Sequence, residues 1–189
     1  MIMRRGPKSE AVPRKRRIST ARAVATIGIL AAVTECAKLA LAALPNVEVV
    51  TLLVALWGYV FGWAGVCATA VFVCVEPLIW GVNTWVITYF LYWPLLSVLF
   101  MILSRCRVRN RVALTTAAVV MTFWFGVLSS LIDVGLLTGY FDNFLYRFGI
   151  YYARGVPFYA VQIACNAVLF PLCFLPLEKR ARRLSGIGG

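Results

Sequence analysis

Long apolar runs, separated by short polar breaks, occupy most of the chain between residues 19 and 177. Hydrophobic residues make up 62% of the sequence, whereas soluble domains are about 45–50% apolar. A soluble core of this size cannot bury so much apolar surface, so we expect the surrounding medium to be a lipid bilayer. The run over 47–82 would extend for about 54 Å as a helix, against about 30 Å of hydrocarbon. This run therefore predicts two membrane spans.

Glycine, proline and asparagine divide the chain into six predicted membrane helices. The clearest breaks are Pro45-Asn46, Gly62 to Gly65 and Gly81 to Thr84, because glycine and proline favour turns. Pro157 is expected in the first turn of the sixth helix, after an aromatic-rich loop over 138–155 in which a short interfacial helix is an alternative. The predicted fold class is an all-α integral membrane protein, with spans of about 19–44, 47–61, 65–81, 84–103, 112–137 and 156–177.

Basic residues are concentrated in three short segments. Of the 19 lysines and arginines, eight lie in 1–22, four in 105–111 and four in 179–183. Six spans place all three segments on one side, which the positive-inside rule identifies as the cytosol. We therefore expect cytosolic termini, with a disordered basic tail over 1–17 and a second basic tail over 178–189. Nucleic acid is not an expected partner, because nucleic-acid binders carry their basic residues on a folded polar face.

Five acidic residues fall in the outer half of the predicted bundle or beyond it: Glu35, Glu48, Glu76, Asp133 and Asp142. An acid at membrane depth costs at least about 2.5 kcal/mol, so several at one level indicate a shared polar cavity open to the outside. Local pairing of Glu35 with Lys38 is an alternative, as is a first-turn role for Glu48 against the helix dipole. Glu76 has no such local partner, so we expect it to face the interior of the bundle.

Polar and aromatic residues near the same level complete a predicted substrate pocket. Gln162 and Asn166 are four residues apart on the sixth span. On the fourth, Trp85, Tyr89 and Trp93 follow one stripe, with Tyr92 as the alternative to Trp93. Such a stripe is also compatible with lipid-facing packing or an interfacial belt. The predicted substrate-binding residues are Asn46 and Glu48 at the rim, Asn166 at the floor, and Glu76, Trp80, Trp85, Tyr89 and Gln162 in the wall.

The first span carries a ridge of small residues, with Gly28, Ala32, Cys36 and Ala40 spaced four apart and Ala21 and Ala25 below them. Small residues allow helices to approach one another closely in lipid. The ridge predicts either packing within the chain or an exposed face on which another membrane protein docks. The predicted docking residues are Ala21, Ala25, Gly28 and Ala32.

Four motifs in order resemble the substrate-binding S components of energy-coupling factor (ECF) vitamin transporters. They are LPNVEVVTLL at 44–53, VFGWAG at 60–65, EPLIWG at 76–81 and GVPFYAVQIACNAVLFPLCFLPL at 155–177, after an alanine-rich first helix. The resemblance covers about residues 20–177. It implies a six-helix protein of the bacterial cell membrane that captures a vitamin or related micronutrient from outside. It also implies that small residues of the first helix dock on a membrane coupling subunit, which two cytosolic ATPase subunits drive.

The sequence gives less support to other classes of function. A membrane-embedded enzyme is not expected, since the chain has no histidine, no GxSxG motif and no metal-ligand cluster, and a Glu76–Asp133 acid–base pair would lack a nucleophile. The absence of a Walker motif means that a partner must hydrolyse ATP. A stand-alone carrier or structural membrane protein is the alternative. No cofactor is expected, and the excess of outer acids together with the many aromatics favours a neutral or cationic ligand with a planar ring.

Overall fold

The computed structural model describes residues 20–44, 47–138 and 141–186. Every regular element within these residues is a helix, so the predicted all-α fold class is confirmed. The elements are α1 (Thr20–Ala40), α2 (Val50–Phe61), α3 (Trp63–Trp80), α4 (Trp85–Arg105), α5 (Arg111–Leu131), the π-helical η1 (Ile132–Leu137), α6 (Phe144–Leu169), the π-helical η2 (Phe170–Phe174) and α7 (Leu175–Ser185).

Five helical segments are long and apolar enough to cross a bilayer: Thr20–Ala40, Trp63–Trp80, Trp85–Arg105, Arg111–Leu136 and Phe144–Ser185. The sixth apolar helix, α2, has only 12 residues. At about 1.5 Å per residue it extends for about 18 Å, less than the hydrocarbon thickness. Ten of its residues are buried, so α2 is an internal helix that its neighbours shield from lipid. The protein is thus a multi-pass helical membrane protein.

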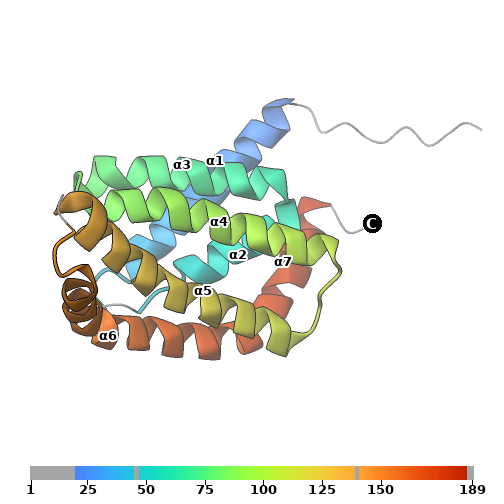
Figure 1. The fold of residues 1–189 in the computed structure, drawn as a ribbon. Coiled ribbons are helices and arrows are strands. Elements are labelled where there is room, and N and C mark those ends of the chain that lie inside the picture. The colour runs from blue at the N-terminus through green and yellow to red at the C-terminus, as the bar shows by residue number, and fades with distance from the viewer. Residues whose placement is uncertain (1–19, 45–46, 139–140, 187–189) are drawn as a thin grey trace, which may run out of the picture.

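The helices form a bundle in which α2 lies between the α3–α4 pair and the α5–α6 pair, while α1 packs against α3 at an angle (Figure 1). The start of α1, the connection between α4 and α5, and α7 lie at one end of the bundle (Figure 1). These are the described parts of the three basic segments. The arrangement agrees with their predicted common side, and the assignment of that side to the cytosol stays a prediction. The tail over 1–17 lies outside the described residues.

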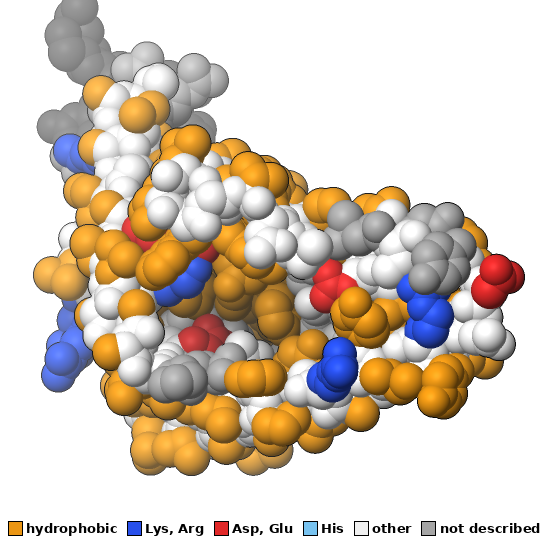
Figure 2. Space-filling view, turned by 90° about the vertical axis from the view of Figure 1, so that its left-hand side faces the viewer, with side chains coloured by type: hydrophobic (Ala, Val, Ile, Leu, Met, Phe, Trp, Pro, Cys, Tyr) orange, Lys and Arg blue, Asp and Glu red, His pale blue; other side chains and the backbone are white. Residues whose placement is uncertain are grey.

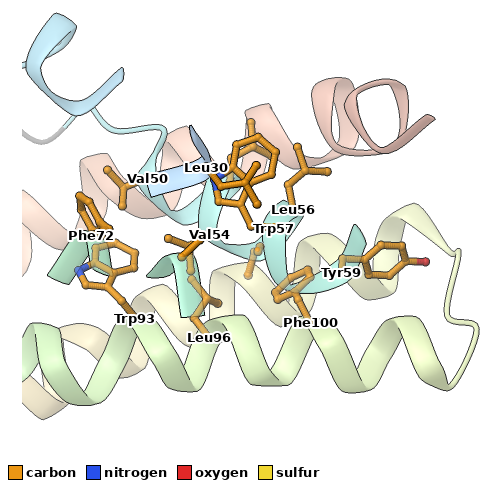
Figure 3. Close-up of a cluster of buried hydrophobic side chains, with 14 of the residues drawn as sticks. Leu30, Val50, Val54, Leu56, Trp57, Tyr59, Phe72, Trp93, Leu96 and Phe100 are labelled. Atoms are coloured by element: carbon orange, nitrogen blue, oxygen red, sulfur yellow. The ribbon is translucent and has the colours of Figure 1, made fainter. Parts of the chain in front are cut away.

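Glycines allow α2 to pack closely against its neighbours. A Cβ atom on Gly58 would lie 2.1 Å from the carbonyl oxygen of Ser97 on α4, and one on Gly65 would lie 2.1 Å from that of Trp57. The break predicted over Gly62 to Gly65 is confirmed at Gly62, which separates α2 from α3 and has a positive φ of 58°. Gly65 lies inside α3. Apolar side chains of α1, α2, α3 and α4 fill the space around α2 (Figure 3).

The C-terminal part of the chain differs from the prediction. Residues 144–155 were expected in a loop, or in part in a short interfacial helix, and instead form the first half of α6. Pro157 lies inside α6 rather than in its first turn. The helix continues through η2 and α7 to Ser185, so most of the predicted tail over 178–189 is helical. Membrane helices tolerate proline because local π-type adjustments and neighbouring groups satisfy the freed carbonyls, and η2 contains Pro171.

Candidate functional site

A cavity of about 460 Å³ opens at the end of the bundle opposite α7. Its lining comes from the end of α1, described residues between α1 and α2, the start of α2, α3, the start of α4, and α5 and α6. Figure 2 shows the hollow, with hydrophobic side chains inside it and charged side chains of both signs at its edge. Helix α2 begins at Val50, and its first two residues, Val50 and Thr51, are part of the cavity lining.

The structure gathers most of the predicted pocket residues around this cavity. Glu48, Trp80, Trp85, Tyr89 and Gln162 line it. Asn166 and Glu76 are fully buried, and each makes a hydrogen bond to a residue that lines the cavity. Asn46 lies outside the described residues. Contact of any of these side chains with a substrate stays a prediction.

Lys38 is the charged group of the site that sequence reasoning missed. Its ammonium donates a hydrogen bond to Oε2 of Glu76 and forms an ion pair with it. The same ammonium lies over three aromatic rings, at 5.5 Å from the centroid of Trp80, 5.9 Å from that of Trp85 and 5.2 Å from that of Tyr89. A cation above aromatic faces is attracted by the ring quadrupoles. The available signal was that Lys38 is the only lysine or arginine between residues 23 and 104.

The alternative of local pairing expected Glu35 to interact with Lys38 on the same helix. In the structure, Glu35 accepts no hydrogen bond from Lys38. Its side chain is buried, and neither carboxylate oxygen makes a hydrogen bond of ordinary geometry within the described residues. The carboxyl group lies within electrostatic range of both Glu76 and Lys38. Lys38 is thus directed across the α1–α3 interface to Glu76 rather than along its own helix. Sequence spacing describes one helix at a time and does not include this contact between helices.

Glu48 is held in place by three hydrogen bonds at the start of α2. Its Oε2 accepts from the backbone N–H of Thr51 at 3.1 Å, and its Oε1 accepts from the Thr51 hydroxyl at 2.5 Å and from Nδ2 of Asn166 at 3.2 Å. Asn166 also donates to the hydroxyl of Thr122 at 3.0 Å. Glu48 precedes α2, so it is not an acid of the first turn as one alternative expected. Its carboxylate nevertheless accepts a hydrogen bond from a backbone N–H of that turn, and at the same time it lines the cavity.

The aromatic stripe of α4 faces the cavity rather than lipid alone. Trp85 and Tyr89 have ring centroids 4.8 Å apart, and Tyr89 meets Trp93 edge to face at 5.6 Å. Tyr92 and Phe125, which the predicted site did not include, also line the cavity, with centroids 4.9 Å apart. Phe125 comes from α5, so its position depends on the α4–α5 packing and has no signature in the local sequence.

Two predicted features lie away from the cavity. Asp133, in η1, and Asp142 are not among the residues that line it. The small residues of α1 are exposed, namely Ala21, Ala25, Gly28, Ala32 and Cys36. A Cβ atom on Gly28 would meet no side chain within 4 Å. This face of α1 is therefore not packed against another part of the described chain.

Comparison with protein-family models, with curated proteins and with solved structures gave no match. What is established is a multi-pass helical membrane protein with a cavity at one end.

Proposed function

We propose that this protein is the substrate-binding membrane subunit of an ECF-type importer, and that it captures a vitamin or related micronutrient. The proposal begins from the four ordered motifs that resemble the S components of this class. The substrate enters the cavity from outside the cell. A membrane coupling subunit and two cytosolic ATPase subunits supply the energy, so the chain itself has no catalytic role.

The observation that carries the proposal is the cavity at the end of the bundle away from the basic segments. Its volume of about 460 Å³ falls within the range of small-molecule sites, about 300–1,000 Å³. Its walls combine aromatic rings with a few polar groups, among them Glu48, Gln162 and Lys38. Such a combination is typical of sites in which apolar contact gives affinity and a few polar groups give orientation.

The exposed face of α1 supports the second part of the proposal, which is docking on a partner in the membrane. Ala21, Ala25, Gly28 and Ala32 leave the backbone of this helix accessible. In lipid, such small residues favour close helix–helix association. A partner helix seated there would connect the cavity subunit to the coupling subunit without covering the cavity end.

The experiment has two steps. The full chain is purified in mild detergent, and the small molecule that accompanies it is identified by mass spectrometry. The chain is then reconstituted in liposomes with the coupling subunit and both ATPases, and uptake of that molecule is measured with ATP. Liposomes without the chain, and liposomes with a non-hydrolysable ATP analogue, are the controls.

We expect uptake that depends on both the chain and ATP hydrolysis. Equal uptake without the coupling module would identify a stand-alone carrier instead. Uptake that is unchanged when the chain is left out would refute a substrate-binding role.

A further inference from the structure

We infer that the cavity binds a small planar nitrogen heteroaromatic ligand that carries one positive charge, and that this charge faces the carboxylate of Glu48. The inference names the substrate class of the proposed importer and depends on that function only for the statement that the ligand is transported. It is carried by the charge balance of the site, by the geometry of Glu48 and by the aromatic walls.

The charge balance of the site is negative. Among the residues that the structure describes, two charged side chains line the cavity, Lys38 and Glu48. The charge of Lys38 is already balanced by Glu76. The ion pairs of the described residues join Lys38 to Glu76, and Arg109 and Arg182 to Glu178, so Glu48 has no cationic partner among them. The balance is negative whether the buried Glu35 is ionised or protonated, and a cationic ligand would bring it towards neutrality.

The geometry of Glu48 leaves room for a ligand. A carboxylate offers about four acceptor positions. Oε1 accepts two hydrogen bonds, from Thr51 and Asn166, while Oε2 accepts one, from the backbone of Thr51. One position on Oε2 is thus left for a donor or a cation. Because the three protein bonds fix the orientation of the carboxylate, it is preorganised for a ligand and need not rearrange on binding.

The walls favour a flat and positively charged molecule. Trp80, Trp85 and Tyr89 line the cavity, and the ammonium of Lys38 lies 5.2–5.9 Å from their ring centroids. Tyr92, Trp93 and Phe125 line the cavity as well and offer further aromatic surface to a ligand. Aromatic faces attract cations and stack with other flat rings. An anionic ligand would instead place a second negative charge beside Glu48. Lys38, the only lysine of the described chain that lines the cavity, is already paired with Glu76.

Three probes with the same fused ring system test the charge preference. They are N-methylquinolinium, which is a cation, quinoline, which is neutral at the pH of the assay, and quinoline-4-carboxylate, which is an anion. Each is titrated by calorimetry into the full chain in lipid nanodiscs, without the co-purified ligand. We expect the cation to bind about ten-fold or more tightly than quinoline, and the anion to bind most weakly.

Two variants test the role of Glu48. Glu48→Gln should reduce the affinity for N-methylquinolinium about ten-fold and leave that for quinoline unchanged. Asp142→Asn, which removes one exposed negative charge away from the cavity, is the matched control and should change neither affinity. If Glu48→Gln does not fold, the affinities of the three probes for the unaltered chain still test whether the cavity prefers a cation.

The inference is overturned if quinoline or its carboxylate binds as tightly as the cation, if no probe binds saturably, or if Glu48→Gln weakens all three probes equally. The importer proposal fails by a different measurement. ATP-dependent uptake combined with a preference for the neutral probe refutes only the charge of the ligand. A preference for the cation in a chain that never associates with a coupling module refutes only the importer.

Discussion

The ammonium of Lys38 on α1 forms an ion pair with the carboxylate of Glu76 on α3. The Glu76 side chain has no exposed surface, and that of Lys38 is 24% exposed. The charge of Glu76 is therefore shielded from water and depends on Lys38 for its stabilisation, whereas the charge of Lys38 borders the cavity. The pair links α1 to the rest of the bundle directly beside the cavity, since Lys38 is also part of its lining.

Removal of either partner should destabilise the protein. Breaking a buried ion pair costs about 3–5 kcal/mol, because the remaining charge is left without compensation. We expect Lys38→Met to lower the free energy of unfolding by about this amount, and Glu76→Gln to lower it by less, because Lys38 is partly exposed and lies within electrostatic range of Glu35. The double substitution should lower it by less than the sum of the two, because both charges are then gone. Unfolding in detergent, followed by circular dichroism, gives the three values. Strictly additive effects would mean that the two side chains do not interact.

Close packing of α2 against α4 gives a second prediction. Gly58→Ala would bring a methyl group to 2.1 Å from the backbone oxygen of Ser97, so one helix must shift. Overpacking of this kind costs about 1–3 kcal/mol, occasionally more. Gly28→Ala is the matched control, because its methyl group meets nothing within 4 Å and alanine favours helix by about 1 kcal/mol. The melting temperature should fall for Gly58→Ala alone; an equal fall for both would contradict the packing argument.

Much of the fold could be predicted because its causes are local. The apolar runs define the membrane medium, and the breaks at Gly62 and near Gly81 follow from the backbone freedom of glycine at positive φ. The predicted start of the sixth helix was wrong because proline is compatible with more than one position in a helix. Pro157 is compatible with a helix start, and also with the interior of a membrane helix whose neighbours satisfy the freed carbonyl. The sequence around Pro157 does not distinguish these two environments.

The candidate site could be predicted only in part. The positions of Trp85 and Tyr89 on one stripe, and of Gln162 and Asn166 on another, follow from helical periodicity. The pairing of Lys38 with Glu76 does not, because it depends on how α1 and α3 lie against each other. A local rule favours Lys38 with Glu35, three residues away, and the tertiary contact replaces that pair.

Membrane orientation gives a third prediction. Cys106 directly follows α4 and Asp142 lies just before α6, and the α4–α5 connection and the start of α6 are at opposite ends of the bundle (Figure 1). Both residues are exposed. In a chain whose other cysteines are replaced, a membrane-impermeant maleimide should not label Cys106 in intact cells and should label it after permeabilisation. In a chain that lacks Cys106 as well, Asp142→Cys should react in intact cells. Labelling of Cys106 in intact cells would show that the orientation in the membrane is the opposite of the predicted one.

Docking through α1 gives the last prediction. Ala32 is exposed on the small-residue face of α1, and its Cβ is the only side-chain atom between a partner helix and the backbone. Ala32→Trp should therefore hold the coupling subunit away and abolish ATP-dependent uptake. Binding of the co-purified ligand should be unchanged, because Ala32 does not line the cavity. Assembly is measured by affinity purification of the complex, and binding by calorimetry on the chain alone.

Val33→Trp is the matched control for the added indole. Val33 is also exposed, with 43% of its surface accessible, and it lies about 100° further around α1 than Ala32. The small-residue face is the dock if Ala32→Trp prevents assembly and Val33→Trp does not. Equal loss from both would indicate that any bulk on α1 disturbs the complex. Loss of ligand binding with intact assembly in Ala32→Trp would assign this face to the stability of the cavity instead of to docking.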